Sequence, residues 1–145
     1  MGREVRMVPK NWEHPTDKNG QYHPMFEESY ENVFNRWLEE RNQWMKGFQK
    51  DWSTHGYKPK KEECKDMSFE EWHGEAPDSR YYMPQWDDKE KTHYMMYETT
   101  SEGTPKSPAF ETPEELAKWL AENNASTFAS MTTDYETWLK IIKGI

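Results

Sequence analysis

The chain has 145 residues and a formal net charge of −8, a length that fits one domain with a modest core. Leu, Ile, Val and Phe number only sixteen, against eight Trp, eight Tyr and nine Met, so we expect a core of aromatic clusters with Met filling the gaps. A single cysteine excludes an intramolecular disulfide bond, and no apolar run reaches the ~18 residues of a membrane span.

Residues 1–24 are predicted to form an extended arm followed by a loop. Residues 3–8 alternate between polar and apolar side chains, as an edge strand does, and three Pro and one Gly interrupt residues 9–24.

Residues 25–50 are predicted to form the long helix of the chain. Apolar side chains recur there at steps of three, four and seven residues, which places them on one face. Phe34, Leu38 and Met45 widen this stripe. We expect the face to be buried in the core, with a partner-binding surface as the alternative. The stripe consists of Phe26, Tyr30, Val33, Trp37, Trp44 and Phe48.

Residues 51–90 are predicted to be irregular, acidic and rich in Pro and aromatic residues. Ser68 and Glu71 have the spacing of a capping box, which favours a short helical turn. Lysines gather before this turn, at Lys58, Lys60 and Lys61. Residues 62–98 hold eleven Asp and Glu but only four Lys and Arg.

Residues 91–145 are predicted to run strand, turn, strand, helix, helix. Tyr94–Glu98 forms the first strand, and Ala109 and Phe110 pair with it across the loop of residues 101–107. Two helices follow, each opened by a capping box and each with an apolar face. The expected boxes are Thr112 with Glu115, after which Pro113 takes the first helical position, and Thr133 with Glu136; Gly144 ends the second helix.

These elements predict an α+β fold in a single domain, residues 1–145. The long N-terminal helix and the two capped C-terminal helices are expected to pack on a small antiparallel hairpin or sheet.

Patterns at both ends of the chain carry a resemblance. They are Glu98–Pro105 with Pro108 and Phe110, then Thr112–Leu116 with Trp119 and Leu120, and at the start Val8–Trp12 with His14 and Pro15. These stretches are similar to those of small, mostly uncharacterised proteins of bacteriophages and prophages. This resemblance implies a phage context and supplies no site residues.

The sequence contains no recognisable catalytic, nucleotide or metal motif. The five His lack the spacing of a helical zinc site, and no Gly-rich phosphate loop is present. Cys64 and His73 are the one conceivable nucleophile and base, but the acids beside Cys64 disfavour its thiolate. We therefore expect no enzyme activity, no catalytic residue, no cofactor and no bound metal.

The acidic middle of the chain is the candidate partner-binding site. Its carboxylates can mimic phosphates toward a basic partner, or they can be a solvated face that keeps an aromatic-rich protein in solution. The aromatic residues beside them can stack on a partner or cover a core. The candidate residues are Glu70, Glu71, Glu75, Asp78, Tyr81, Tyr82, Trp86, Asp87 and Asp88.

The expected function is that of a phage or prophage accessory protein that binds a protein partner. Its most concrete form is an acidic inhibitor of a host defence nuclease complex, whose basic channel binds nucleic acid. The alternative is a virion or morphogenesis component anchored by exposed aromatic residues, and an enzyme of unrecognised class comes third. We expect the protein in the host cytoplasm (in the virion under the alternative), with no direct DNA binding and no membrane association.

Overall fold

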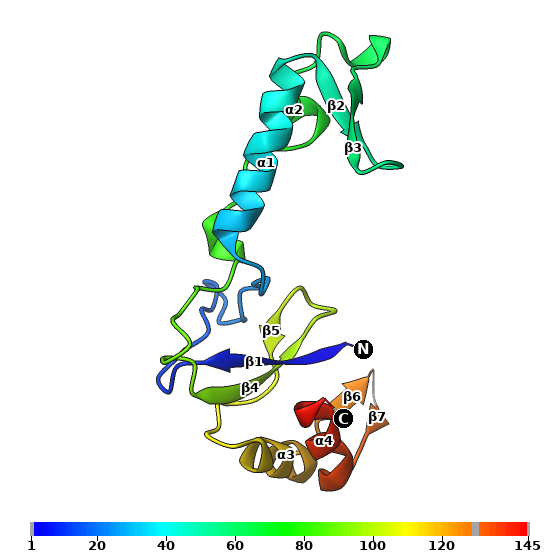
Figure 1. Ribbon diagram of the computed structural model, residues 1–145. Helices are drawn as coiled ribbons and strands as arrows, with labels where there is room; N and C mark the ends of the chain where they lie inside the picture. Colours follow the sequence, from blue (N-terminus) through cyan, green and yellow to red (C-terminus); the bar gives the residue numbers. More distant parts are fainter. Residues whose placement is uncertain (1, 129–130, 145) are drawn as a thin grey trace. The chain divides into compact units, whose positions relative to one another are not determined.

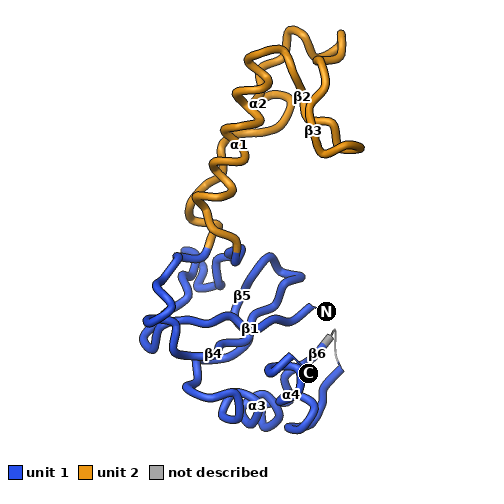
Figure 2. Tube along the Cα trace, viewed as in Figure 1, with its two compact units in different colours: residues 1–27, 83–145 blue, residues 28–82 orange. Residues whose placement is uncertain are grey.

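The computed structural model describes residues 2–128 and 131–144, which group into two compact units (Figures 1 and 2). Unit 1 is Met1–Glu27 together with Met83–Ile145, and unit 2 is Glu28–Tyr82. Helices and small antiparallel sheets make up both units, which confirms the α+β class. The sequence predicted one domain and did not anticipate this division; whether the units unfold together stays a prediction.

The sheet of unit 1 has the strand order β1-β4-β5 and is antiparallel throughout. Its strands are β1 (Arg3–Val8), β4 (His93–Glu98) and β5 (Thr104–Pro105). β1 lies at an edge, as predicted, and the Arg3 guanidinium contacts the Glu98 carboxylate opposite it at 2.9 Å. The predicted pairing of Tyr94 with Phe110 is present as a single bridge, with β5 inside the connecting loop.

The central strand β4 is buried on both faces. Met96 packs against Leu116, Leu120 and Trp138, which belong to α3 (Pro113–Glu122) and α4 (Tyr135–Lys143). Met95 and Tyr97 face the other way, into a cluster with Val8, Met25 and Met83. The two predicted C-terminal helices therefore cover one face of the sheet, and the loops that flank unit 2 cover the other.

The two C-terminal helices begin at different kinds of cap. The Thr112 hydroxyl accepts from the Glu115 amide at 3.1 Å and donates to the Glu115 carboxylate, which confirms the predicted cap of α3. The prediction of Thr133 as the second cap is wrong. Asp134 caps α4, because its carboxylate accepts from the Thr137 amide at 2.9 Å and suits the positive helix end.

A short ribbon that the sequence analysis missed lies between these helices. It consists of β6 (Ser126–Phe128) and β7 (Met131–Thr132). The predicted stop at Gly144 is confirmed, since this residue ends α4 with a left-handed φ of 74°.

Unit 2 is built from one helix, one hairpin and a second short helix. Its elements are α1 (Tyr30–Met45), β2 (Phe48–Asp51), β3 (Gly56–Pro59) and α2 (Phe69–Trp72), with single 3-10 turns at Glu62–Cys64 and Ser79–Tyr81. The predicted helix over 25–50 is too long at both ends. Ser29 caps α1, and Gly47, with a φ of 99°, turns the chain into the unpredicted hairpin.

The core of unit 2 is a small aromatic cluster around Trp44, Cys64 and Phe69. Trp72 of α2 stacks on Trp44 with ring centroids 4.8 Å apart, and the predicted Ser68 cap of α2 is present. The apolar stripe of α1 is only partly core. Trp44 is buried and Trp37 half-buried, while other members of the stripe reach solvent.

Gly103 connects two segments of unit 1 that are far apart in sequence. Its carbonyl accepts from the Met25 amide at 3.0 Å, and its φ is 95°. A Cβ at this position would overlap the Met25 carbonyl and crowd the Arg6 guanidinium. Only glycine fits here, because both the backbone angle and the close approach exclude a side chain.

We predict that Thr112→Ala and Asp134→Ala each lower the free energy of unfolding by about 0.5–2 kcal/mol, because each exposes an unpaired helix amide. Urea denaturation measures the change. Thr112→Ser and Thr133→Ala are the matched controls and should leave the midpoint near that of the wild type. A loss with Thr133→Ala equal to that with Asp134→Ala would contradict the assigned cap.

We predict that Gly103→Ala lowers the stability of unit 1 by about 2 kcal/mol or more, from backbone strain and the displaced Met25 carbonyl. Gly20→Ala is the control, because its φ of 79° is also positive but no atom lies within 4 Å of its added Cβ. Thermal unfolding of both variants separates the effect of the close approach from that of the backbone angle. Equal losses would show that the close approach has no influence.

Candidate functional site

A cleft of about 520 Å³ opens in unit 2 where three segments converge. The first wall is one face of α1, where Val33, Arg36, Trp37 and Glu40 follow the helical spacing of three, four and seven residues. Helix periodicity therefore places an aromatic ring, a cation and a carboxylate side by side.

The hairpin of β2 and β3 supplies the second wall, through Lys50, Trp52 and His55. Trp52 lies in the turn between the strands and is 65% exposed, an unusual position for the largest apolar side chain. His55 has a φ of 61°, a strained backbone angle for a residue other than glycine. The turn thus holds two rings at the mouth of the cleft.

A hydrogen-bonded pair links α1 to the third wall. The Glu40 carboxylate, 8% exposed, contacts Nε2 of His73 at 3.0 Å, and the His73 ring stacks on Phe69 at 4.9 Å. Tyr82 completes this wall, and burial raises the pKa of its phenol. The cleft can thus stack a planar group and offer it both donors and acceptors.

A second surface of unit 2 combines apolar and acidic side chains. Leu38 and Met45 are seven residues apart on α1, which places them on one face of the helix, and Met45 is 70% exposed. Beside them Arg41 binds the Glu70 carboxylate of α2 at 3.1 Å. We call Leu38, Met45, Glu70 and Glu71 the α1–α2 face.

The nine predicted partner-binding residues are divided between the two units. Glu70, Glu71, Glu75, Asp78, Tyr81 and Tyr82 belong to unit 2, while Trp86, Asp87 and Asp88 belong to unit 1. Within unit 2, Glu70, Glu71 and Glu75 are exposed, and Tyr81 is 42% exposed. One continuous surface formed by all nine residues stays a prediction.

Several of these residues already have partners. Asp78 binds Arg80 at 2.7 Å and Asp88 binds Lys91 at 3.1 Å, both pairs being solvent-exposed and therefore weak. Trp86 is half-buried and packs edge-on against Trp12 at 4.9 Å, next to the core of unit 1. It acts at least partly as a core residue.

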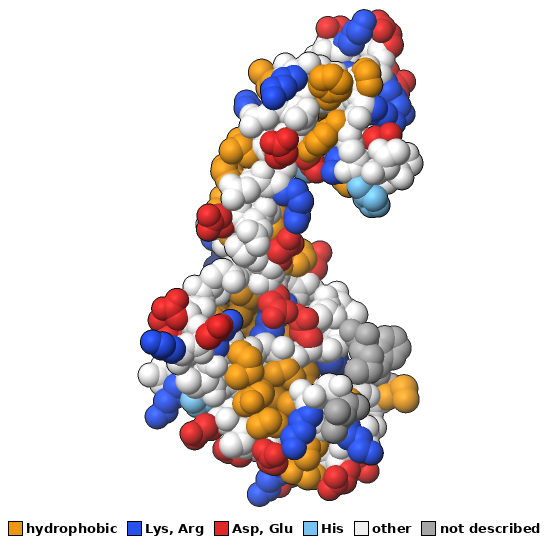
Figure 3. Space-filling model, viewed as in Figure 1, with side chains coloured by type: hydrophobic (Ala, Val, Ile, Leu, Met, Phe, Trp, Pro, Cys, Tyr) orange, Lys and Arg blue, Asp and Glu red, His pale blue; other side chains and the backbone are white. Residues whose placement is uncertain are grey.

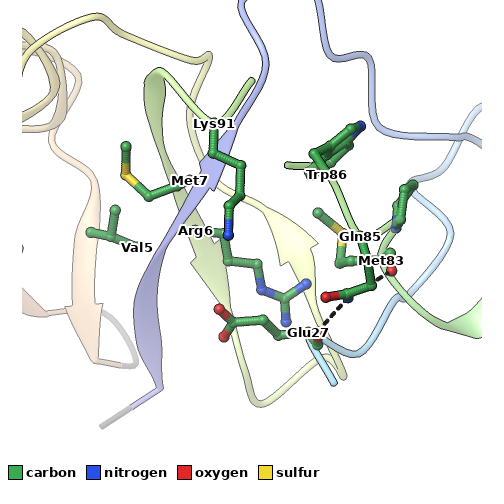
Figure 4. Close-up of a pocket in the computed structure, with 9 residues that line it drawn as sticks. Val5, Arg6, Met7, Glu27, Met83, Gln85, Trp86 and Lys91 are labelled. Atoms are coloured by element: carbon green, nitrogen blue, oxygen red, sulfur yellow. Dashed lines mark hydrogen bonds between the residues drawn. The ribbon is translucent and has the colours of Figure 1, made fainter. Parts of the chain in front are cut away.

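Unit 1 has a pocket of about 210 Å³ between β1 and the segment after Met83. Figure 4 shows Arg6, Glu27 and Lys91 on one side of it and Met83, Gln85 and Trp86 on the other. Burial, and then the neighbouring Glu4, raise the pKa of Glu27. The Arg6 guanidinium binds the Glu4 carboxylate at 2.8 Å and the Met25 carbonyl at 2.7 Å. At this pocket Arg6 therefore holds segments of unit 1 together.

A second cleft of unit 1, of about 660 Å³, lies beside a chain of hydrogen bonds. Trp12 Nε1 donates to the Tyr97 hydroxyl at 3.0 Å. His14 Nε2 contacts the His23 carbonyl at 2.6 Å and therefore carries a proton; in the neutral ring Nδ1 then accepts from the Tyr97 hydroxyl at 2.9 Å. Burial lowers the pKa of His14 and so favours this neutral ring, with Arg6 acting in the same direction.

The described residues form neither an exposed thiol nor a cluster of metal ligands. Cys64 is buried in the core of unit 2, away from solvent. Among residues 2–128 and 131–144, no three His, Cys, Asp or Glu side chains gather as a metal site requires. The same residues include no helix both long and apolar enough to cross a membrane.

Comparisons of the chain with protein-family models, with curated proteins and with solved structures gave no match. The site must therefore be judged on its own geometry.

Sequence reasoning missed the cleft because its walls are distant in sequence. The Glu40–His73 pair joins α1 to the segment after α2, and no spacing of residues in the sequence predicts this contact. A weak signal existed for the hairpin, where the polar residues 53–55, followed by Gly56, connect two strands with aromatic residues.

We predict that the free energy of unfolding decreases as the pH falls below about 6.5, because the unfolded chain takes up a proton on His14 more readily than the folded one. The stability that comes from the neutral His14 is fully present above that pH. It is lost as the pH falls toward the lower pKa of His14 in the folded protein. Urea denaturation of the wild type and of His14→Gln between about pH 5 and 8 measures the slope. Equal slopes in both proteins would contradict this role of His14.

Proposed function

We propose that this protein is a non-enzymatic accessory protein that binds a protein partner, and that the α1–α2 face is the binding surface. The exposure of large apolar side chains on unit 2 carries the proposal. Leu38, Met45, Phe48, Trp52 and Tyr81 all belong to this small unit and are at least 36% exposed. Figure 3 shows hydrophobic side chains at the surface of both units, with acidic and basic ones around them.

The apolar part of the α1–α2 face suits the centre of an interface. Burying Met45, which is 70% exposed, against a partner would contribute about 1–2 kcal/mol before the losses of association, and burying Leu38, which is 36% exposed, would contribute less. Met adapts its shape to a partner, and Leu38 and Met45 repeat along one helix as anchor residues do in helix–groove complexes.

The acidic part of this face indicates the charge of the partner. Residues 62–78 hold seven Asp and Glu and one Lys, and Glu70 and Glu71 project from α2 into solvent. A basic protein surface would be attracted to them and would associate faster at low salt. An inhibitor of a host defence nuclease complex, the form suggested by the phage resemblance, would bind such a surface where nucleic acid otherwise lies.

A virion or morphogenesis role is the second candidate. The strong exposure of Trp52 and Tyr81 favours it, because exposed aromatic rings anchor one protein in pockets of another. Such a protein would sediment with phage particles, whereas an inhibitor would sediment with the host complex.

We predict that Met45→Asp and the double change Glu70→Lys/Glu71→Lys each weaken capture of the partner from host lysate about tenfold, the equivalent of about 1.4 kcal/mol. Quantitative mass spectrometry of proteins retained on the immobilised full chain measures this. Added salt should weaken the wild type more than the double variant. Asp87→Lys/Asp88→Lys, applied to unit 1, tests whether the second half of the acidic stretch contributes.

Met131→Asp is the matched control, since Met131 is 64% exposed but lies in unit 1. A partner that is retained equally by the wild type, Met45→Asp and the Glu70/Glu71 variant would refute the α1–α2 face as its binding surface. Thermal unfolding of each variant verifies that the fold is intact.

A further inference from the structure

The segment that contains the hairpin of unit 2 and its flanking residues is basic in an otherwise acidic protein. Residues 46–61 hold five Lys and a single Asp, while the whole chain has a net charge of −8. Charges more than about 10 Å away are largely screened at physiological salt, so the lysines nearest to a ligand weigh more than the net charge of the whole chain. We call Lys46, Lys50, Lys58, Lys60 and Lys61 the hairpin lysines.

The charges of the hairpin lysines are available to a ligand. None of the five forms an ion pair with any residue in the described part of the chain. Two of them are held in place by aromatic rings. The Lys50 ammonium lies 5.1 Å from the ring centroid of Tyr57 and donates to the His55 carbonyl. The Lys60 ammonium lies 4.2 Å from the ring centroid of Trp44. These contacts orient the ammonium groups without neutralising them.

Aromatic rings accompany these cations. Trp52 stands exposed in the turn, at the mouth of the cleft that Trp37 and Tyr82 line further in. Lys50 and Arg36 line the same cleft, which also contains the Glu40–His73 pair. Rings that can stack a base, cations that can contact phosphates and polar groups that can meet a base edge therefore occur within one small unit.

We infer that the hairpin lysines and the cleft of unit 2 form a binding surface for single-stranded nucleic acid. A base stacks on Trp52 at the mouth of the cleft, and the hairpin lysines contact the phosphates of the neighbouring nucleotides. A single strand fits better than a duplex, because stacking on a side chain needs an unpaired base. A nucleotide carries a planar base and a phosphate together, so one ligand of this class uses both the rings and the lysines.

This inference runs against the expectation, based on the net charge of the whole chain, that the protein does not bind nucleic acid directly. It goes beyond the proposed protein partner and, apart from Trp52, uses different residues of unit 2. A complex of a basic protein with its nucleic acid would offer complementary groups to both surfaces.

The test is a titration of fluorescently labelled oligothymidylate, about twelve nucleotides long, with the full chain, followed by fluorescence anisotropy. Binding is expected at low salt, and log K plotted against log salt concentration should have a slope of about −3, as for four or five phosphate contacts. Trp52→Ala should weaken binding about tenfold, the size of one lost stacking contact. Oligouridylate and a duplex of the same length show whether a single strand of either sugar is preferred.

Matched variants separate local from overall charge. The triple variant Lys46→Glu/Lys58→Glu/Lys61→Glu should abolish binding. The triple variant Lys18→Glu/Lys89→Glu/Lys118→Glu in unit 1 makes the same change in net charge. It should retain most of the binding to the oligonucleotide. Met131→Ala is the control for Trp52→Ala. The Glu70→Lys/Glu71→Lys variant, which tests the protein partner, should retain the oligonucleotide, so the two proposals can fail separately.

Three results would overturn the inference. The first is absence of binding to either oligonucleotide at low salt. The second is an equal loss in both triple variants, which would show a dependence on net charge alone. The third is binding of polyglutamate as tight as that of the oligonucleotides and unaffected by Trp52→Ala, which would assign the hairpin lysines to an acidic protein.

Discussion

The Tyr97 side chain is completely buried on the central strand of unit 1, and its hydroxyl is bonded from two directions. Burial raises the pKa of this phenol to about 12, so it keeps the proton that it donates to His14. The Arg6 guanidinium lies over the ring, 4.4 Å from its centroid, and reaches the Met25 carbonyl. Residues 9–25, which have no regular strand or helix, are thereby attached to the sheet and cover the face that α3 and α4 leave open.

Unit 2 has a different basis for its stability. Its 55 residues, Glu28–Tyr82, bury few side chains completely. The largest of them, Trp44, stacks on Trp72 and also has the Lys60 ammonium over its ring. A segment of this size cannot enclose all of its aromatic residues, so several remain at the surface. The same shortage of core volume that limits the stability of this unit leaves its rings available for contacts with other molecules.

The parts of the fold that could be predicted are those encoded locally. Thr112, Pro113 and Glu115 define the start of α3 through bonds within four residues, and Ser68 does the same for α2. The prediction that Thr133 caps α4 was wrong because the neighbouring Asp134 offers a better acceptor at the same helix end. The hairpin was not predicted because Phe48 continues the helical spacing of the apolar residues in α1. The helix itself ends before Gly47, whose positive φ turns the chain. The cleft depends on Glu40 meeting His73, a tertiary contact without a local signature.

Unit 2 enters and leaves unit 1 at almost the same point. The Met83 amide donates to the Phe26 carbonyl at 2.8 Å, and the Gln85 side chain bonds the Glu27 carbonyl. The chain is thus closed across the whole insertion by backbone that belongs to unit 1. Because the two ends of the insertion are held this close together, a short Gly-Ser bridge can join them without stretching the sheet. Insertions are tolerated best where the ends of the inserted segment lie close together, so this site is suited to hold other segments while unit 1 keeps its own core.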